Sequence, residues 1–178
     1  MPIKTTLPRS VLLKYMNPYF LETGTADADC TRLAIDVGFE KVYSIDVNQI
    51  SQDRNRLDLK EIINSGNVTL ITGDSLHELS KLIPSLDKPT TFWLDAHGSY
   101  DGFTGAKSCP LYEELQAIKS SEIKTHTIMM DDMRILGGNW GRGIDQGTLK
   151  QKCLEINSEY KFTLENGHVP NDILVAYI

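Results

Sequence analysis

Acidic residues end four of the apolar runs in this 178-residue chain. Glu22 ends the run YFLE, Asp46 ends VYSID, Asp95 ends TTFWLD, and Asp131 and Asp132 end THTIMMDD. Apolar runs of this length predict buried strands, and the carboxyl ends of parallel strands meet at one edge of a sheet. We therefore expect these carboxylates at a common edge, where they could bind the hydroxyl groups of a ligand or a cation.

One part of this pattern suits a nucleotide. The stretch 19–46 predicts a strand, a glycine turn, a helix and a strand that ends in Asp46. Gly24 has no Cβ, so its backbone can approach a ligand, and Asp46 could accept hydrogen bonds from both hydroxyls of a ribose. Asp74 and Ser75 follow the next strand, where the edge of an adenine would lie. The chain therefore predicts an adenosine-type ligand.

The remaining acids suit a metal ion. Consecutive strand–helix units place the strands before Asp95 and Asp131 side by side, so Asp95, Asp131 and Asp132 should converge beside the nucleotide pocket. Three crowded carboxylates repel each other unless a cation or protons compensate their charge. Oxygen ligands of this kind suit Mg²⁺ or another hard divalent ion.

Each of these residues also has a purely structural interpretation. Asp46 and Asp74 precede predicted helices and could cap them. Glu22 could accept backbone amides of its own loop, and Asp131 with Asp132 could cap the turn that follows. Asp95 could likewise be an ordinary acid at the end of a strand. The occurrence of such acids at successive strand ends favours the ligand-binding interpretation.

Strand-like and helix-like runs alternate along the chain. Strands are predicted at 19–22, 42–46, 68–72, 90–95, 125–131, 160–165 and 172–178, and helices at 27–37, 49–64, 76–83, 110–119 and 148–157. The alternation predicts an α/β fold: a mostly parallel, seven-stranded sheet with helices on both faces. Only ENGHVPN separates the last two strands, so they should form a terminal antiparallel hairpin. We expect a single domain over 1–178, with 1–18 as an N-terminal arm or cap.

Composition narrows the possible partners and the compartment. The net charge of −6 argues against broad binding of nucleic acid or of an anionic membrane. No signal peptide and no apolar run of about 20 residues is present. Cys30, Cys109 and Cys153 lack metal-type spacing and indicate reduced thiols, so we expect a cytoplasmic protein.

Several motifs resemble those of a known family. Glu22-Thr23-Gly24-Thr25, Asp46 and Gly73-Asp74-Ser75 are similar to the S-adenosyl-L-methionine-binding motifs of class I methyltransferases, over 19–178. Five strand–helix units followed by a hairpin also resemble their Rossmann-like methyltransferase sheet. The family's first motif ends in glycine, and this chain has Ala28 there. The resemblance implies that the following residues bind the cofactor: Glu22, Thr23, Gly24, Thr25, Asp46, Asp74, Ser75 and Asp95.

Within that family, the acids most resemble those of macrocin-type, metal-dependent sugar O-methyltransferases. By this resemblance, Asp95, Asp131 and Asp132 hold a divalent metal, Mg²⁺ being the first candidate. The residue two positions after the first of these acids is the general base of those enzymes and is usually acidic, whereas here it is His97. The resemblance implies that His97 and Asp95 are catalytic, with His97 as base, metal ligand or substrate contact.

The implied activity is methyl transfer to a hydroxyl of a sugar or another small polyol. The implied partner is a small-molecule or glycan acceptor, and a homo-oligomer is possible. Two alternatives stay open: a protein that binds S-adenosyl-L-methionine or a nucleotide without transfer, and a nicotinamide-dependent enzyme on a similar sheet. The acid cluster with His97 counts against the first, and the terminal hairpin and the acids count against the second.

Two loops could complete an acceptor pocket. Tyr100 and Phe103 flank the loop that carries His97. The glycine-rich stretch 137–147 could form a lid, in which Trp140 would stack on a sugar or aromatic face and Arg142 would meet an anionic group.

Overall fold

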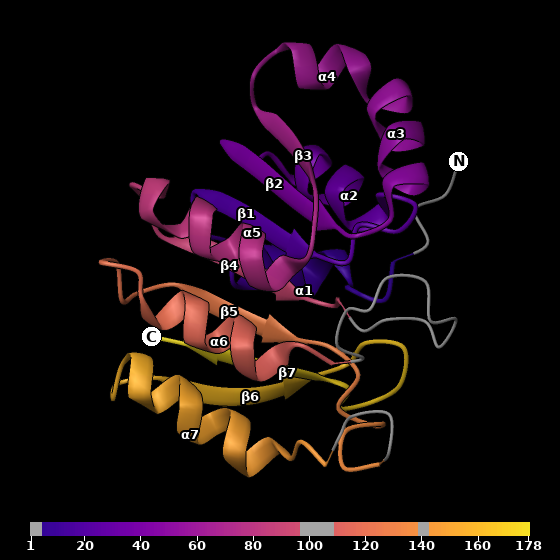
Figure 1. Cartoon of the computed structure of the whole chain (residues 1–178). Coiled ribbons are helices and arrows are strands. Elements are labelled where there is room, and N and C mark those ends of the chain that lie inside the picture. Colours follow the sequence, from indigo (N-terminus) through magenta and orange to yellow (C-terminus); the bar gives the residue numbers. More distant parts are fainter. Residues whose placement is uncertain (1–4, 97–108, 139–142) are drawn as a thin grey trace.

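Seven strands form one sheet in the computed structural model, which describes residues 5–96, 109–138 and 143–178 (Figure 1). The strands are β1 (Tyr19–Thr23), β2 (Lys41–Asp46), β3 (Val68–Thr72), β4 (Thr90–Leu94), β5 (Thr127–Met130), β6 (Lys161–Glu165) and β7 (Ile173–Tyr177). Their order is β3-β2-β1-β4-β5-β7-β6. The first five are parallel, and β7 runs antiparallel to both β5 and β6. The predicted mostly parallel sheet with a terminal antiparallel hairpin is confirmed.

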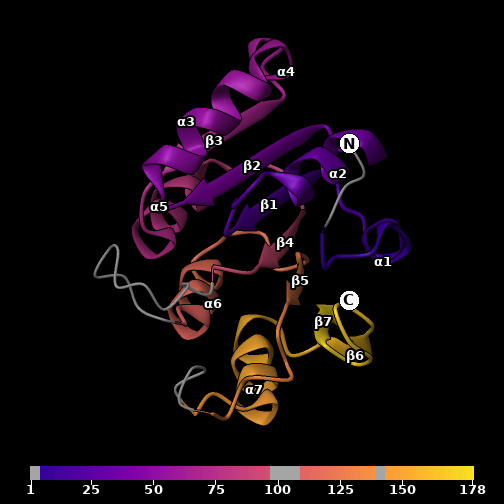
Figure 2. The ribbon, with the colours of Figure 1, turned by 90° about the vertical axis from the view of Figure 1, so that its right-hand side faces the viewer.

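Helices cover both faces of the sheet, as Figure 2 shows. They are α1 (Arg9–Lys14), α2 (Asp29–Val37), α3 (Gln49–Asp58), α4 (Lys60–Asn64), α5 (Ser75–Leu82), α6 (Leu111–Lys119) and α7 (Gln146–Ile156), with a short 3₁₀ helix at Ile83–Ser85. One hydrophobic core joins the sheet to α5, α6 and α7, and a second joins it to α1 and α2. Successive residues of a strand point to opposite faces. Accordingly, Phe92 packs in the first core and Trp93 in the second.

The central strands β1, β4 and β5 are buried along their whole length. This explains why their sequences are continuous apolar runs instead of an alternation of apolar and polar residues, because both faces of these strands are covered by helices. The carboxyl ends of the five parallel strands lie at one edge of the sheet.

The segment 49–64 differs from the single helix that its sequence predicts. The structure divides it into α3 and α4 at Leu59, which is buried and accepts the backbone N–H groups of Ile62 and Ile63. The apolar side chains of Ile50 and Leu57 on α3 are 74% and 76% exposed. A helix that packs through its apolar stripe would bury these residues, so α3 must contact the rest of the chain through other side chains.

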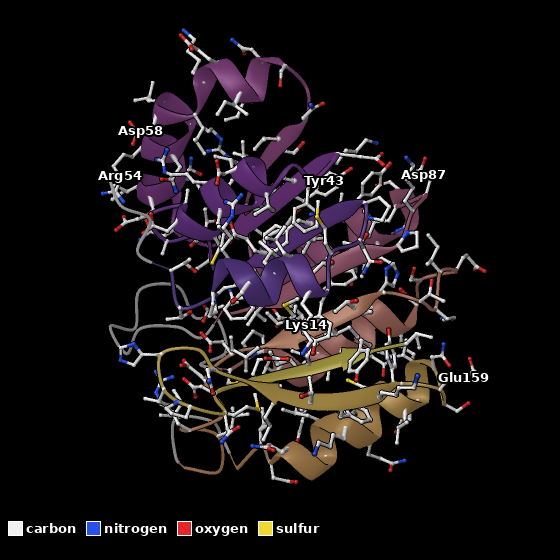
Figure 3. All side chains as sticks on the ribbon, turned by 180° about the vertical axis from the view of Figure 1, so that it is seen from behind. Lys14, Tyr43, Arg54, Asp58, Asp87 and Glu159 are labelled. Atoms are coloured by element: carbon white, nitrogen blue, oxygen red, sulfur yellow. The ribbon has the colours of Figure 1, made fainter. Side chains whose placement is uncertain are left out.

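The segment before β1 contains α1, which packs against α2 (Figure 3). Leu7 and Leu12 are fully buried in the second core. Within the described part of the chain, every helix is too short or too polar to cross a membrane.

Candidate functional site

The strand order reverses between β1 and β4, at the middle of the sheet. In an open parallel sheet, this reversal leaves a crevice beyond the carboxyl ends of the strands, where ligands bind. Gly24 follows β1 at this point with φ of +88°, a backbone conformation that favours glycine. A Cβ at Gly24 would overlap the carbonyl group of Asp95, which follows β4. Gly24 is therefore required for the close approach of two loops, in addition to any approach of a ligand.

Glu22 is fully buried at this edge, with no exposed surface. Its Oε1 accepts hydrogen bonds from the hydroxyls of Ser44, at 2.6 Å, and Thr31. Its Oε2 has no hydrogen-bond partner among the described residues. Burial raises the pKa of Glu22 to about 8, the two hydroxyls oppose that shift, and the charges of Asp95 and Asp46 add to it. A buried carboxyl group with one oxygen unpaired is unfavourable in a folded protein, which makes this edge a candidate functional site.

The loop between β1 and α2 has an unusual backbone. Ala26 and Ala28 have φ of +45° and +60°, in the left-handed region that is unfavourable for residues with a Cβ. Ala28 is the residue that replaces the second motif glycine, and it is the N-cap of α2, with its N–H donated to the carbonyl of Thr25 at 2.7 Å. Ala28 thus adopts a left-handed backbone conformation that glycine would adopt more easily.

Asp46 ends β2 beside this loop. Its Oδ2 accepts the N–H of Ala26 at 2.8 Å, and its Oδ1 accepts the N–H of Asn48 at 2.7 Å. Asp46 thus orders the loop after β1 and the start of α3 at once. The next residue, Val47, is 39% exposed, although it is apolar and close to the crevice. Val47 could not be singled out from the sequence, because one apolar residue after a strand is common.

Asp74 is the N-cap of α5, and its Oδ1 accepts the N–H of Leu76 at 3.0 Å. The capping interpretation is therefore confirmed for this residue. Ser75 is buried at the first position of α5. The predicted contact of Asp74 and Ser75 with an adenine stays a prediction.

Asp95 and Asp131 follow the neighbouring strands β4 and β5. The register pairs Leu94 with Met130, so the next residue of each strand is one of these acids, and the N–H of Asp131 donates to the carbonyl of Leu94 at 3.3 Å. Burial, together with the charge of Asp95, raises the pKa of Asp131 to about 6. Asp95 and Asp131 therefore follow paired residues of neighbouring strands, as expected, and the charge of Asp95 disfavours the ionised form of Asp131.

Asp131 is 1% exposed and is covered by the N-terminal segment. The hydroxyl of Thr6 donates to its Oδ2 at 2.7 Å. Its Oδ1 has no hydrogen-bond partner among the described residues. The segment predicted as an arm or cap therefore contacts the carboxyl edge directly, and it leaves one oxygen of Asp131 available to a further ligand.

A third acid joins Asp131 and Asp132, and it is Asp172. Oxygens of these three side chains lie within 4.8 Å of one another, and Asp95 is not a member of this group. Asp172 precedes β7, which runs antiparallel to β5, so the start of β7 meets the end of β5. Asp172 was not among the predicted site residues, because its approach to Asp131 and Asp132 depends on the pairing of β7 with β5.

Arg134 compensates part of this charge. Its guanidinium forms ion pairs with Asp132, where Nη1 and Oδ1 are 2.6 Å apart, and with Asp172. The backbone N–H of Arg134 also donates to Oδ1 of Asp172 at 3.0 Å. The backbone of Asp132 has φ of +64°, which turns its side chain out of the strand direction. The acids of this edge therefore meet one cation of the chain before any metal is considered.

Several predicted site residues lie outside the described residues. They are His97, Tyr100, Phe103, Trp140 and Arg142. Their predicted roles as base, pocket wall and lid stay predictions.

Comparisons with known proteins establish the fold. The sequence matches no protein-family model and no curated protein. An O-methyltransferase from Bacillus cereus, solved in complex with SAH, matches with a TM-score of 0.64 and 13% identity, over 96% of this chain and 78% of that one. A methyltransferase from Geobacter sulfurreducens matches with a TM-score of 0.60 and 15% identity, over 95% and 74%.

A spermidine synthase in complex with the transition-state analogue AdoDATO matches with a TM-score of 0.57 and 13% identity, over 89% of this chain and 52% of that one. The chain therefore has the Rossmann-like methyltransferase fold. Identities of this size show the fold alone, and the same sheet carries different transfer reactions.

Proposed function

We propose that the chain is an S-adenosyl-L-methionine-dependent O-methyltransferase that acts, with a divalent metal, on a hydroxyl of a sugar or another small polyol. The observation that supports it best is the line of Gly24, Asp46, Asp74 and Asp95 at the carboxyl ends of four adjacent strands, around the reversal in strand order. The similar O-methyltransferase from Bacillus cereus was solved with SAH.

The residues of this edge fit such a cofactor. Each carboxylate oxygen of Asp46 accepts one backbone N–H and keeps a lone pair that can accept a hydrogen bond from a ribose hydroxyl. The exposed side chain of Val47 offers an apolar surface to a base. The carboxylates of Asp46 and Asp95 give the crevice a negative potential, which suits a cationic sulfonium.

The acids at β4, β5 and β7 supply the second half of the site. Asp95, Asp131 and Asp132 would hold the metal, and Asp172 is a further carboxylate within reach of the latter two. The unpartnered, buried Oδ1 of Asp131 and the hard oxygen donors fit a divalent cation. When bound, the metal would lower the pKa of an acceptor hydroxyl.

Arg134 has two roles in this arrangement. It neutralises Asp132 and Asp172, and its guanidinium keeps both carboxylates at fixed places. His97 would accept the proton of the acceptor hydroxyl, as its place two residues after Asp95 suggests. The sheet would hold the acceptor oxygen and the methyl group in line.

Thermal unfolding with S-adenosyl-L-methionine, SAH or NAD tests the cofactor. At 100 times the dissociation constant, a ligand adds about 2.7 kcal/mol to the unfolding free energy, or roughly 5–10 °C for a chain of this size. We expect this shift with the first two compounds and none with NAD. Asp46→Asn should reduce it, whereas Asp58→Asn, on the exposed side of α3 (Figure 3), should leave it intact. A shift with NAD alone would contradict the proposal.

A screen with a radiolabelled methyl donor tests the reaction and the acceptor. Glycans, small polyols and phenols are offered with Mg²⁺ and again with a chelator. Incorporation into a polyol that is lost with the chelator supports the whole proposal. Incorporation that persists in the chelator excludes the metal and leaves Arg134 as the cation of the site. Binding of SAH without any transfer would support the alternative of a binding protein.

A further inference from the structure

Helix α3 buries polar side chains and exposes apolar ones. Gln52 and Asn55 are 0% and 1% exposed, whereas Ile50 and Leu57 on the same helix are largely in solvent. Burying an amide side chain is unfavourable unless its hydrogen bonds are replaced, while exposed apolar surface forgoes the hydrophobic stabilisation of burial. The inner face of α3 is therefore poorly suited to stabilise the fold and well suited to hydrogen-bond its neighbours.

Those neighbours are three consecutive residues of the loop after β1. Gln52 Nε2 donates to the hydroxyl of Thr25 at 3.0 Å, and Asn55 Nδ2 donates to the carbonyl of Ala26 at 2.9 Å. Arg54 pairs with Asp27 at the surface, where both side chains are more than half exposed. Figure 3 shows Arg54 on the outer side of α3. The helix thus contacts every residue of the loop from 25 to 27.

Both backbone polar groups of Ala26 are hydrogen-bonded to side chains. Its N–H donates to Asp46, and its C=O accepts from Asn55. Asp46 in turn accepts the N–H of Asn48, whose side chain caps α3 by accepting the N–H of Ser51. These contacts close a ring from β2 through α3 to the loop. Because Ala26 adopts φ of +45°, the ring stabilises a backbone that this residue would otherwise leave.

Gln52 connects the same helix to Glu22. Ser44 donates to Glu22, so the Ser44 oxygen accepts from Thr25 at 2.6 Å, and Thr25 accepts from Gln52. Gln52 also donates to the carbonyl of Ile71 on β3 at 2.9 Å. This chain of hydrogen bonds runs from β3 to the buried acid of β1, and each bond polarises the next.

We propose that Gln52 and Asn55 are positioning residues, which hold the loop 24–28 in the conformation that binds the cofactor. The inference rests on the proposed function, because it assigns the buried amides of α3 to the same crevice. Neither residue needs to touch the ligand: Asn55 acts through Ala26 and Asp46, and Gln52 acts through Thr25.

Calorimetric titration of SAH into the full chain tests this at a temperature where every variant is folded. Asn55→Leu and Gln52→Met remove the donors and keep the approximate size, and the milder Asn55→Ser and Gln52→Asn are measured alongside. Ile50→Ala and Leu57→Ala, at exposed side chains of the same helix, are the matched controls. We expect the SAH dissociation constant to rise about 10-fold for loss of either buried donor and less than about 3-fold for the controls.

A second substitution separates positioning from simple destabilisation. Ala26→Gly lowers the strain of the left-handed backbone, so in the Asn55→Leu background it should recover part of the lost SAH affinity. Variants that lower the unfolding free energy but bind SAH like the wild type would overturn this inference alone. A wild-type chain that does not bind SAH would overturn the proposed function, and the inference with it.

Discussion

The two ends of the sheet treat their buried titratable groups differently. At the amino end, His126 is fully buried between β4 and β5, and both ring nitrogens have partners: Nδ1 accepts the N–H of Thr90 at 3.1 Å, and Nε2 lies 2.9 Å from the hydroxyl of Ser121. At the carboxyl end, Glu22 and Asp131 each keep one buried oxygen without a hydrogen-bond partner among the described residues.

This difference separates stability from function. Burial lowers the pKa of His126 to about 4, so the ring is neutral and its hydrogen bonds are complete within the fold. Burial raises the pKa of Glu22 to about 8 and of Asp131 to about 6, which is the opposite of what a stable charged pair would show. At the amino end, His126 has both hydrogen bonds within the fold, whereas at the carboxyl end Glu22 and Asp131 each keep an oxygen that has no partner among the described residues and that a proton, a ligand or a cation could use.

The largest effect should come from Asp131→Asn. If the carboxyl end is catalytic, loss of this ligand removes several kcal/mol of transition-state stabilisation, or roughly a 10³-fold fall in turnover. SAH affinity should stay within a few-fold, because the nucleotide half is untouched. Steady-state rates with calorimetry of SAH check both. Full activity of Asp131→Asn would show that the two ends do not differ in the proposed way.

The corresponding change at the amino end is His126→Leu. It removes the hydrogen-bond acceptor of the Thr90 N–H and leaves the Ser121 hydroxyl with only the N–H of Ile123, so it should destabilise the fold by about 2–4 kcal/mol. Urea unfolding measures this loss. SAH affinity below the unfolding transition should be unchanged, and an affinity loss as large as that of Asp46→Asn would remove the contrast between the ends.

The pH dependence of stability should carry opposite signs at the two ends. The folded pKa of His126 lies below its usual 6.5, so its contribution is present above pH 6.5 and is lost as the pH falls toward 4. The folded pKa of Glu22 lies above its usual 4.5, so its contribution is present below pH 4.5 and is lost as the pH rises toward 8.

Each group can change the unfolding free energy by at most about 1.4 kcal/mol per pH unit within its window. Unfolding free energies of the wild type, Glu22→Gln and His126→Leu from pH 4 to 8 separate the two. Glu22→Gln should remove the fall in stability between about pH 4.5 and 8, and His126→Leu should remove the rise in stability between about pH 4 and 6.5. Identical pH profiles for all three proteins would contradict both assignments.

The smallest effect should come from Ala26→Gly. The exposed Ala26 has φ of +45°, and relief of this strain should raise the unfolding free energy by up to about 1 kcal/mol. Glycine at the exposed Ser65, whose backbone is right-handed helical, is the control and should destabilise slightly. Thermal melts distinguish the two, and a destabilising Ala26→Gly would show that the loop is not strained.

The central strands β1, β4 and β5 could be predicted because their burial on both faces requires continuous apolar runs in the sequence. The acids at their ends could be located for the same reason, and the hairpin followed from its short connection. The break of 49–64 at Leu59 could not, since neither glycine nor proline marks it. Hydrophobic periodicity also misleads on α3, where the buried face is made of Gln52 and Asn55.

The membership of Asp172 in the acid group required the register of β5 against β7, which no single segment encodes. Asp132 and Arg134 are close in sequence, whereas the ion pair of Arg134 with Asp172 depends on the same register. Pairings between distant segments are therefore what sequence patterns leave undetermined at this site.

Calorimetric titration of SAH into the wild type and Asp46→Asn, side by side, tests the central claim most directly. The two proteins differ by one carboxylate oxygen at the end of β2. We predict one SAH site per wild-type chain and an affinity at least 10-fold weaker in Asp46→Asn. Equal affinities, or no heat of binding in the wild type, would contradict the claim that this edge of the sheet binds the cofactor.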